Sequence, residues 1–224
     1  PLWLSTMILK TELLPHQLDA FNKVSKHKVG ALFMDMGTGK SRVAVELIQF
    51  YRNKGVNRAI WVCPVNTKTN IAKEIDKHSS GLKVKMIEER GIGDADVLVG
   101  TETISQSDKM YTKMLSVFDG CLLIVDESHA FKTPIAKRSK RLMECAPKAY
   151  ARYIMTGTPI TKGFEDLYCQ MAILSKKILG YSSYNQFAYY HLVFDPARKG
   201  RVKSRLYYDY VTTKITPYVY QVKR

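Results

Sequence analysis

The chain has 224 residues, of which 46% are hydrophobic and 25% charged, so it can bury one large core or two small ones. Its 35 Lys and Arg residues against 20 Asp and Glu residues give a net charge of +15. This balance indicates a polyanionic partner, with nucleic acid ahead of an anionic membrane surface. No apolar run approaches the roughly 18 residues of a membrane-spanning helix, so we expect no membrane partner and a cytoplasmic location.

Apolar, strand-like runs alternate with helix-like stretches along most of the chain. Helical patterns cover residues 14–21, 44–51 and 71–75. The strand candidates are residues 29–36, 58–65, 82–87, 96–101, 121–125 and 150–155. Continuous apolar strands separated by helices predict an α/β fold, with a mostly parallel central sheet and helices on both faces. In such a sheet, ligands bind beyond the carboxyl ends of the strands.

The composition changes near residue 180. Residues 181–224 hold nine of the 14 tyrosines, and eight Lys or Arg residues against two Asp residues. We therefore divide the chain into a lobe at 1–180 and a helical, Tyr-rich and basic extension at 181–224. The four cysteines lie far apart and the five histidines show no metal-ligand spacing, which predicts buried reduced thiols and no structural metal.

The sharpest signal is Gly37-Thr38-Gly39-Lys40-Ser41, which follows a strand candidate and begins a helical pattern. A phosphate-binding loop requires this context, because glycines let backbone N–H groups close around phosphate oxygens at a helix N-terminus. In this interpretation Lys40 reaches the β- and γ-phosphates and Ser41 ligates Mg²⁺. Met34 stands where the general motif has its first glycine.

Two further signals follow later strand candidates. Asp126 and Glu127 come directly after the run at 121–125. One carboxylate can hold the hydrated Mg²⁺ of a nucleotide and the other can accept a proton from an attacking water, although an acidic turn that caps a helix is the alternative. Thr156-Gly157-Thr158-Pro159 follows the run at 150–155. Its hydroxyls could hydrogen-bond a phosphate-sensing neighbour, but an ordinary turn explains it equally.

A basic stretch follows the acidic pair and contains Lys132, Lys137, Lys140 and Arg141. Helical spacing places the last three of these on one face. Such a face suits contacts with nucleic-acid phosphates, which give affinity without base specificity. The alternative is a solvated basic face.

Taken in order, GTGKS at 37–41, DESH at 126–129 and TGTP at 156–159 resemble motifs I, II and III of superfamily 2 helicases and translocases, and the Swi/Snf-type branch is most similar. LPHQ at 14–17 looks like the adenine-reading Q motif, VCPV at 62–65 like motif Ia, and VGTET at 99–103 like motif Ib. The match covers residues 10–175. The motif forms and compact loops look most like phage or prophage members.

The resemblance implies the N-terminal RecA-like lobe of a P-loop NTPase, with ATP and Mg²⁺ as its cofactors. The family pattern assigns nucleotide binding to Gln17, Gly37, Thr38, Gly39, Lys40 and Ser41. It assigns catalysis to Lys40, Asp126 and Glu127, with Glu127 as the general base, and places Ser41 and Asp126 at the metal. It assigns the coupling between nucleotide state and DNA grip to His129, Thr156 and Thr158.

By the same resemblance, Pro64, Lys68 and Thr101 lie along the nucleic-acid backbone, and we expect Lys132, Lys137 and Lys140 to bind DNA as well. Pro64 could instead simply end a strand, and Thr101 could simply cap a helix. Duplex DNA is favoured as the partner from the resemblance alone.

The family builds its active site between two RecA-like lobes, and nothing in 160–224 looks like the second one. We therefore expect the second lobe of the full-length protein as a partner, and an isolated fragment that is nearly inactive. One alternative is the motor lobe of a restriction-type system or an RNA helicase. Another is a non-catalytic nucleic-acid-binding module that ATP switches.

Overall fold

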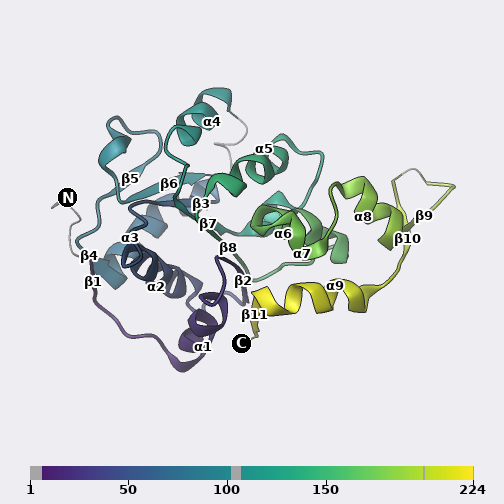
Figure 1. The fold of residues 1–224 in the computed structure, drawn as a ribbon, viewed down its shortest axis with the longest axis horizontal. Coiled ribbons are helices and arrows are strands. Elements are labelled where there is room, and N and C mark those ends of the chain that lie inside the picture. Colours follow the sequence, from purple (N-terminus) through teal and green to yellow (C-terminus); the bar gives the residue numbers. More distant parts are fainter. Residues whose placement is uncertain (1–6, 102–106, 199, 224) are drawn as a thin grey trace.

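The computed structural model describes residues 7–101, 107–198 and 200–223. Its centre is a seven-stranded sheet in which every neighbouring pair of strands is parallel (Figure 1). In spatial order the strands are β11 (Val219–Val222), β2 (Val29–Met34), β8 (Ala151–Thr156), β7 (Leu122–Asp126), β3 (Ala59–Cys63), β6 (Val97–Thr101) and β5 (Val84–Met86). The six strand candidates all lie in this sheet, so the predicted α/β fold with a parallel sheet is confirmed.

Helices cover both faces of the sheet. The helices are α1 (Pro15–Val24), α2 (Lys40–Arg52), α3 (Lys68–His78), α4 (Asp108–Leu115), α5 (Lys137–Cys145), α6 (Leu167–Leu174), α7 (Lys176–Leu179), α8 (Tyr184–His191) and α9 (Tyr208–Ile215). Short 3-10 turns include η1 (Val65–Thr67), η4 (Ser128–Phe131) and η6 (Phe164–Asp166). Apolar side chains of α1, α2 and α3 share one core cluster, and those of α4, α5 and α6 share another.

Alternation along each strand explains the two clusters. Leu123 and Val125 of β7 belong to the core under α4 to α6, whereas Leu122 and Ile124 belong to the core under α1 to α3. All four are buried, and a fully buried side chain of this size contributes about 1.5–3 kcal/mol. Because both faces are covered, the strands read as continuous apolar runs in the sequence.

The extension is only partly helical. It contains α8 and α9 as expected, but also the antiparallel pair β9 (Leu192–Phe194) and β10 (Val202–Arg205). Its last strand, β11, pairs with β2 at the edge of the central sheet, and Asp35 N–H donates to the Val222 carbonyl 3.2 Å away. The extension therefore returns to the lobe just before the glycine-rich loop. The division at residue 180 stays a prediction.

Two small features complete the described part of the chain. The two-residue strands β1 (Ile8–Leu9) and β4 (Ser79–Ser80) pair and hold the N-terminal segment beside α3.

None of the helices in the described ranges combines the length and apolarity needed to cross a bilayer. Within those ranges, too, no group of three or more His, Cys, Asp and Glu side chains could hold a metal ion, and all four cysteines are buried.

Candidate active site

The glycine-rich loop joins the carboxyl end of β2 to the first residue of α2. Gly37 and Gly39 have φ angles of 79° and 83°, in the left-handed region that favours glycine. A Cβ on Gly39 would lie 2.2 Å from Gln17 Nε2, so any other residue there would displace the Gln17 side chain from the loop. Lys40 begins α2, and its Nζ donates to the carbonyl oxygens of Met34 at 2.8 Å and Asp35 at 3.3 Å.

The first turn of α1 is tied to this loop. His16 Nε2 lies 2.8 Å from the carbonyl oxygen of Thr38, and Gln17 Nε2 donates to the same oxygen at 3.2 Å. The other side of the Gln17 amide, Oε1, accepts from Leu14 N–H at 3.0 Å and so caps α1. The Gln17 side chain is therefore buried and fixed against the glycine-rich loop.

The acidic pair lies at the carboxyl end of β7. Asp126 is the last residue of the strand, and its Oδ1 accepts from Glu127 N–H at 2.9 Å. Burial and the neighbouring Glu127 charge together raise the pKa of Asp126 to about 6, although Lys40 opposes the shift. Glu127 has a φ of 47°, in the left-handed region, so the chain turns sharply directly after the strand.

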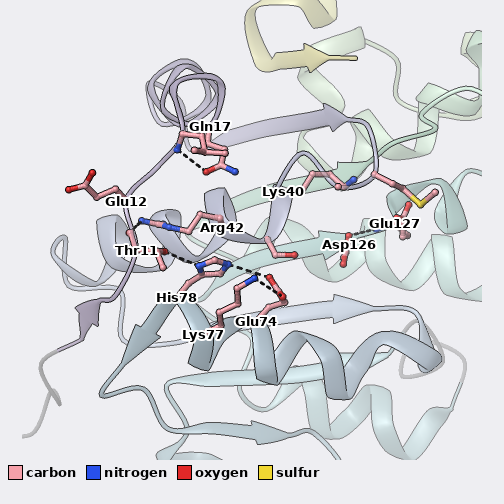
Figure 2. Close-up of a pocket in the computed structure, with 15 residues that line it drawn as sticks. Thr11, Glu12, Gln17, Lys40, Arg42, Glu74, Lys77, His78, Asp126 and Glu127 are labelled. Carbon is pink, nitrogen blue, oxygen red and sulfur yellow. Dashed lines mark hydrogen bonds and ion pairs between the residues drawn. The ribbon is translucent and has the colours of Figure 1, made fainter. Parts of the chain in front are cut away.

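One pocket of about 500 Å³ brings the glycine-rich loop and the acidic pair together (Figure 2). Its lining includes Gln17, Gly37, Gly39, Lys40, Ser41, Asp126 and Glu127. Residues about 90 positions apart in the chain meet because β2 and β7 both flank β8 in the parallel sheet. A volume of this size is typical of small-molecule sites.

The far end of this pocket holds residues that sequence reasoning missed. Arg42 is buried and donates through Nη2 to the Thr11 carbonyl at 2.6 Å, while His78 Nδ1 lies 2.8 Å from Thr11 Oγ1. Burial lowers the pKa of His78, against the opposing effect of Glu74. Arg42 could have been noticed because it follows the glycine-rich loop directly, but Thr11 and His78 belong to no recognisable motif.

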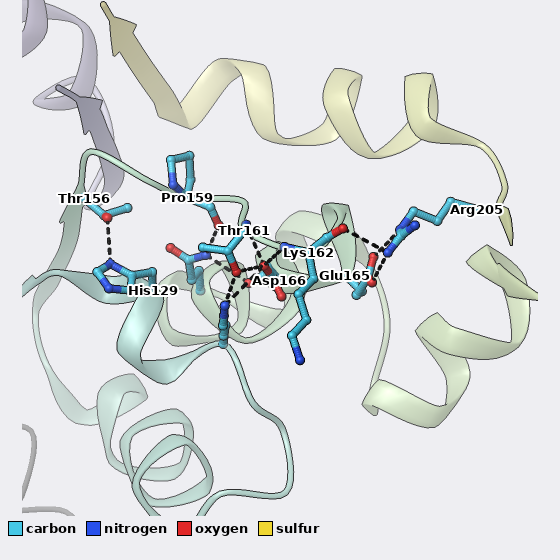
Figure 3. Close-up of polar contacts among 10 residues, drawn as sticks. His129, Thr156, Pro159, Thr161, Lys162, Glu165, Asp166 and Arg205 are labelled. Carbon is cyan, nitrogen blue, oxygen red and sulfur yellow. Dashed lines mark hydrogen bonds and ion pairs between the residues drawn. The ribbon is translucent and has the colours of Figure 1, made fainter. Parts of the chain in front are cut away.

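The Thr156-Gly157-Thr158-Pro159 turn contacts the acidic pair directly. The Thr156 hydroxyl is buried and donates to Glu127 Oε2 at 3.0 Å. It also lies 3.1 Å from His129 Nδ1 and accepts from Thr158 N–H at 3.1 Å (Figure 3). Because the hydroxyl has one proton and gives it to Glu127, His129 Nδ1 must carry a proton and donate. The three predicted coupling residues therefore gather at one carboxylate.

The predicted nucleic-acid residues fall into two groups. Pro64 follows β3 and Lys68 begins α3, where its Nζ pairs with Glu88 at 3.3 Å. Thr101 ends β6, next to β3, so its backbone lies at the same edge of the sheet as Pro64. The rest of the proposed motif Ib, Glu102 and Thr103, lies outside the described residues.

The second group follows β7. Lys132 contacts Thr161 and lies 3.6 Å from Asp166, while Lys137 pairs with Asp108 at 2.9 Å. Lys140 is exposed on the same helix as Lys137. Lys132 and Lys137 already have carboxylate partners, whereas Lys140 forms no ion pair with the described residues.

Comparison with solved structures defines the class of fold. The Sulfolobus solfataricus SWI2/SNF2 ATPase core, solved in complex with dsDNA, superposes with a TM-score of 0.79 and 23% sequence identity. The match covers 96% of this chain and 45% of that one. The fold is therefore that of a RecA-like lobe of a SWI2/SNF2 ATPase core.

The family follows from the sequence comparisons. The SNF2-related domain matches residues 16–194, and the chain belongs to this family. ATP-dependent helicase fft1 of Schizosaccharomyces pombe is 28% identical over 161 residues, which cover 66% of this chain and 17% of that protein. The human DNA annealing helicase and endonuclease ZRANB3 is 28% identical over 181 residues, which cover 77% of this chain and 17% of that protein. This chain thus spans less than a fifth of either relative.

Proposed function

We propose that this chain is the ATP-binding first lobe of an ATP-dependent DNA translocase or helicase-like motor. The observation that carries the proposal is the single pocket lined by both the glycine-rich loop and the acidic pair. Family membership and relatives named as ATP-dependent helicases support the same activity.

The pocket residues fit a nucleoside triphosphate with its magnesium ion. Backbone N–H groups at 37–41 and the N-terminus of α2 attract phosphate oxygens, and Lys40 must leave the Met34 and Asp35 carbonyls to reach them. The Ser41 hydroxyl and the Asp126 carboxylate supply the oxygen ligands that Mg²⁺ prefers. The bound ion would neutralise charge on the phosphates as it develops. Gln17 at the loop is our candidate for adenine recognition.

Glu127 is the proposed general base. Its Oε2 accepts from Thr156 and lies 3.2 Å from His129 Nδ1, so two groups hold the carboxylate in place. An ionised carboxylate at this position can orient an attacking water and take its proton. The same contacts offer a route by which the 156–159 turn senses the nucleotide.

We propose duplex DNA as the nucleic-acid partner and a second RecA-like lobe as the source of missing catalytic groups. The net charge of +15 supports a DNA partner, and so does the similar archaeal ATPase core, which was solved in complex with dsDNA. Pro64, Lys68 and Thr101 are the proposed backbone contacts at one edge of the sheet, and Lys140 is the proposed contact after β7. A phage or prophage origin and a cytoplasmic location stay predictions from the motif forms and the composition.

The replacement Glu127→Gln in the full-length protein tests this function. We expect ATP turnover to fall by about 10²–10⁴, because the amide cannot accept a proton, while ATP binding persists. Turnover should be measured with no nucleic acid, with duplex DNA and with duplex RNA, and Glu144→Gln on the exposed side of α5 is the matched control. Unchanged turnover in Glu127→Gln would show that Glu127 is not the general base. ATP binding without turnover in the wild-type protein would favour the ATP-switched module, and stimulation by RNA alone would favour an RNA helicase.

A further inference from the structure

A buried glutamine stands behind the acidic pair. Gln170 lies in the middle of α6, a helix in which all eight side chains are buried, and it is 0% exposed. Its neighbours on the helix are mostly apolar, so no helical polar face explains its presence. Burial of an amide costs free energy unless each polar atom finds a hydrogen-bond partner.

Gln170 finds three such partners in two separate segments. Its Oε1 accepts from Ser128 Oγ at 2.7 Å, and its Nε2 donates to the carbonyl oxygens of Pro159 at 2.8 Å and Asp166 at 2.9 Å. A flipped amide would place its oxygen against two carbonyl oxygens, so the orientation is fixed by its surroundings. Ser128 is also 0% exposed, and this bond holds its hydroxyl in the interior.

Two of these partners, Ser128 and Pro159, belong to the two turns that meet at the candidate active site. Ser128 lies between Glu127 and His129, and Pro159 ends the turn that begins at Thr156. The Gln170 amide therefore joins the two turns by a route separate from the contact between Thr156 and Glu127. Because the backbone at Glu127 has a positive φ, the position of its carboxylate depends on how the following residue is anchored.

The connection continues towards the extension. The Asp166 carboxylate accepts from the backbone N–H groups of Thr161 and Lys162 at 2.8 and 2.9 Å, which shapes the loop after Pro159. Next to it, Glu165 pairs with Arg205 of β10 through two hydrogen bonds of 2.6 and 2.7 Å. Together, η6 and α6 thus contact both turns and the extension.

We propose that Gln170 is a positioning residue, which through Ser128 and Pro159 keeps the two active-site turns in register and so couples nucleic-acid binding to ATP hydrolysis. This inference rests on the proposed ATPase function. Gln170 itself does not line the nucleotide pocket. Its loss should therefore spare nucleotide binding and reduce the stimulation of turnover by DNA.

The test uses the full-length protein with Gln170→Met, Ser128→Ala and the double variant. For both single variants we expect roughly tenfold less stimulation of kcat by duplex DNA, a typical loss for a broken coupling contact. The KM for ATP and the Kd for the fluorescent nucleotide mant-ADP should change less than about twofold. The double variant should be no worse than Gln170→Met, because both changes interrupt one connection.

Ile173→Val is the matched control, since Ile173 is fully buried on the same helix and makes no polar contact through its side chain. Ser128→Ala keeps the test decisive if Gln170→Met fails to fold. Undiminished DNA stimulation in the folded variants, additive losses in the double variant, or the same loss in Ile173→Val would each overturn the inference and leave the proposed function intact. A wild-type protein that neither binds mant-ADP nor hydrolyses ATP would overturn both.

Discussion

The Thr156 hydroxyl shows how much can depend on one atom. It donates to Glu127 and accepts from His129 and Thr158, so all of its hydrogen-bonding capacity is used inside the protein. A sequence motif of two threonines around a glycine predicts a turn, but it does not reveal which hydroxyl faces inward. The Thr156 side chain is 0% exposed, whereas Thr158 lines a second pocket, which also includes Glu127 and His129. The two threonines therefore have different roles.

Thr156→Val tests this arrangement because valine has nearly the same shape and lacks the hydroxyl. Glu127 would keep His129 and lose its threonine donor, and a hydrogen bond to a charged group is worth about 1.5–3 kcal/mol. We expect kcat for ATP hydrolysis by the full-length protein to fall by about 10–100-fold with little change in mant-ADP affinity. Thr112→Val on the exposed face of α4 is the control. A variant with normal kcat would show that Glu127 needs no help from Thr156.

Among the elements, the loop before α6 depends on a single carboxylate. Asp166 is 5% exposed, and its Oδ2 accepts from Thr161 N–H, Thr161 Oγ1 and Lys162 N–H. Burial acts to raise the pKa of Asp166, but these hydrogen bonds together outweigh it, so the pKa lies below the ordinary value. The folded state therefore binds this proton less readily than the unfolded chain does.

Asp166→Asn should lower the stability of this chain in a pH-dependent way. A depressed carboxyl pKa stabilises the fold fully above the unfolded pKa of about 3.9, and this contribution is lost as the pH falls through the folded pKa. At pH 7 we expect a loss of about 1–2 kcal/mol, or roughly 2–8 °C in Tm. The gap between variant and wild type should narrow towards pH 3 in thermal melts. Exposed Asp119→Asn is the control, and a gap that stays constant with pH would contradict this account.

How far the sequence predicts these elements depends on where each lies in the sheet. Strands such as β3 and β7 are buried on both faces and appear as continuous apolar runs, so the sequence predicts them closely. β11 lies at the edge, is only half-buried and includes Tyr220 and Gln221, so it carries no such run and was missed. The sequence does not reveal the role of Gln170 either. That role depends on hydrogen-bond partners 11 and 42 residues away, which only the fold brings together.

At the scale of the whole molecule, the candidate active-site residues lie at the carboxyl ends of neighbouring parallel strands. β2, β7 and β8 end at the glycine-rich loop, the acidic pair and the 156–159 turn, and these three ends are neighbours because the strands are parallel. The sequence predicts this meeting from the order of its motifs. It could not predict that β11 of the extension would pair beside β2, next to the same loop.

The proposed function places a second RecA-like lobe next to this pocket, and this leads to the last prediction. Lys40, Ser41 and the acidic pair all come from this chain, and we propose that the second lobe supplies an arginine that stabilises the transition state. Such an arginine is worth about 10³–10⁵ in rate. The isolated 224-residue chain should therefore bind mant-ADP yet hydrolyse ATP at least about 10³-fold more slowly than the full-length protein in single-turnover assays with duplex DNA. Glu127→Gln in the isolated chain sets the background, and brisk DNA-stimulated turnover above it would mean that one lobe is sufficient.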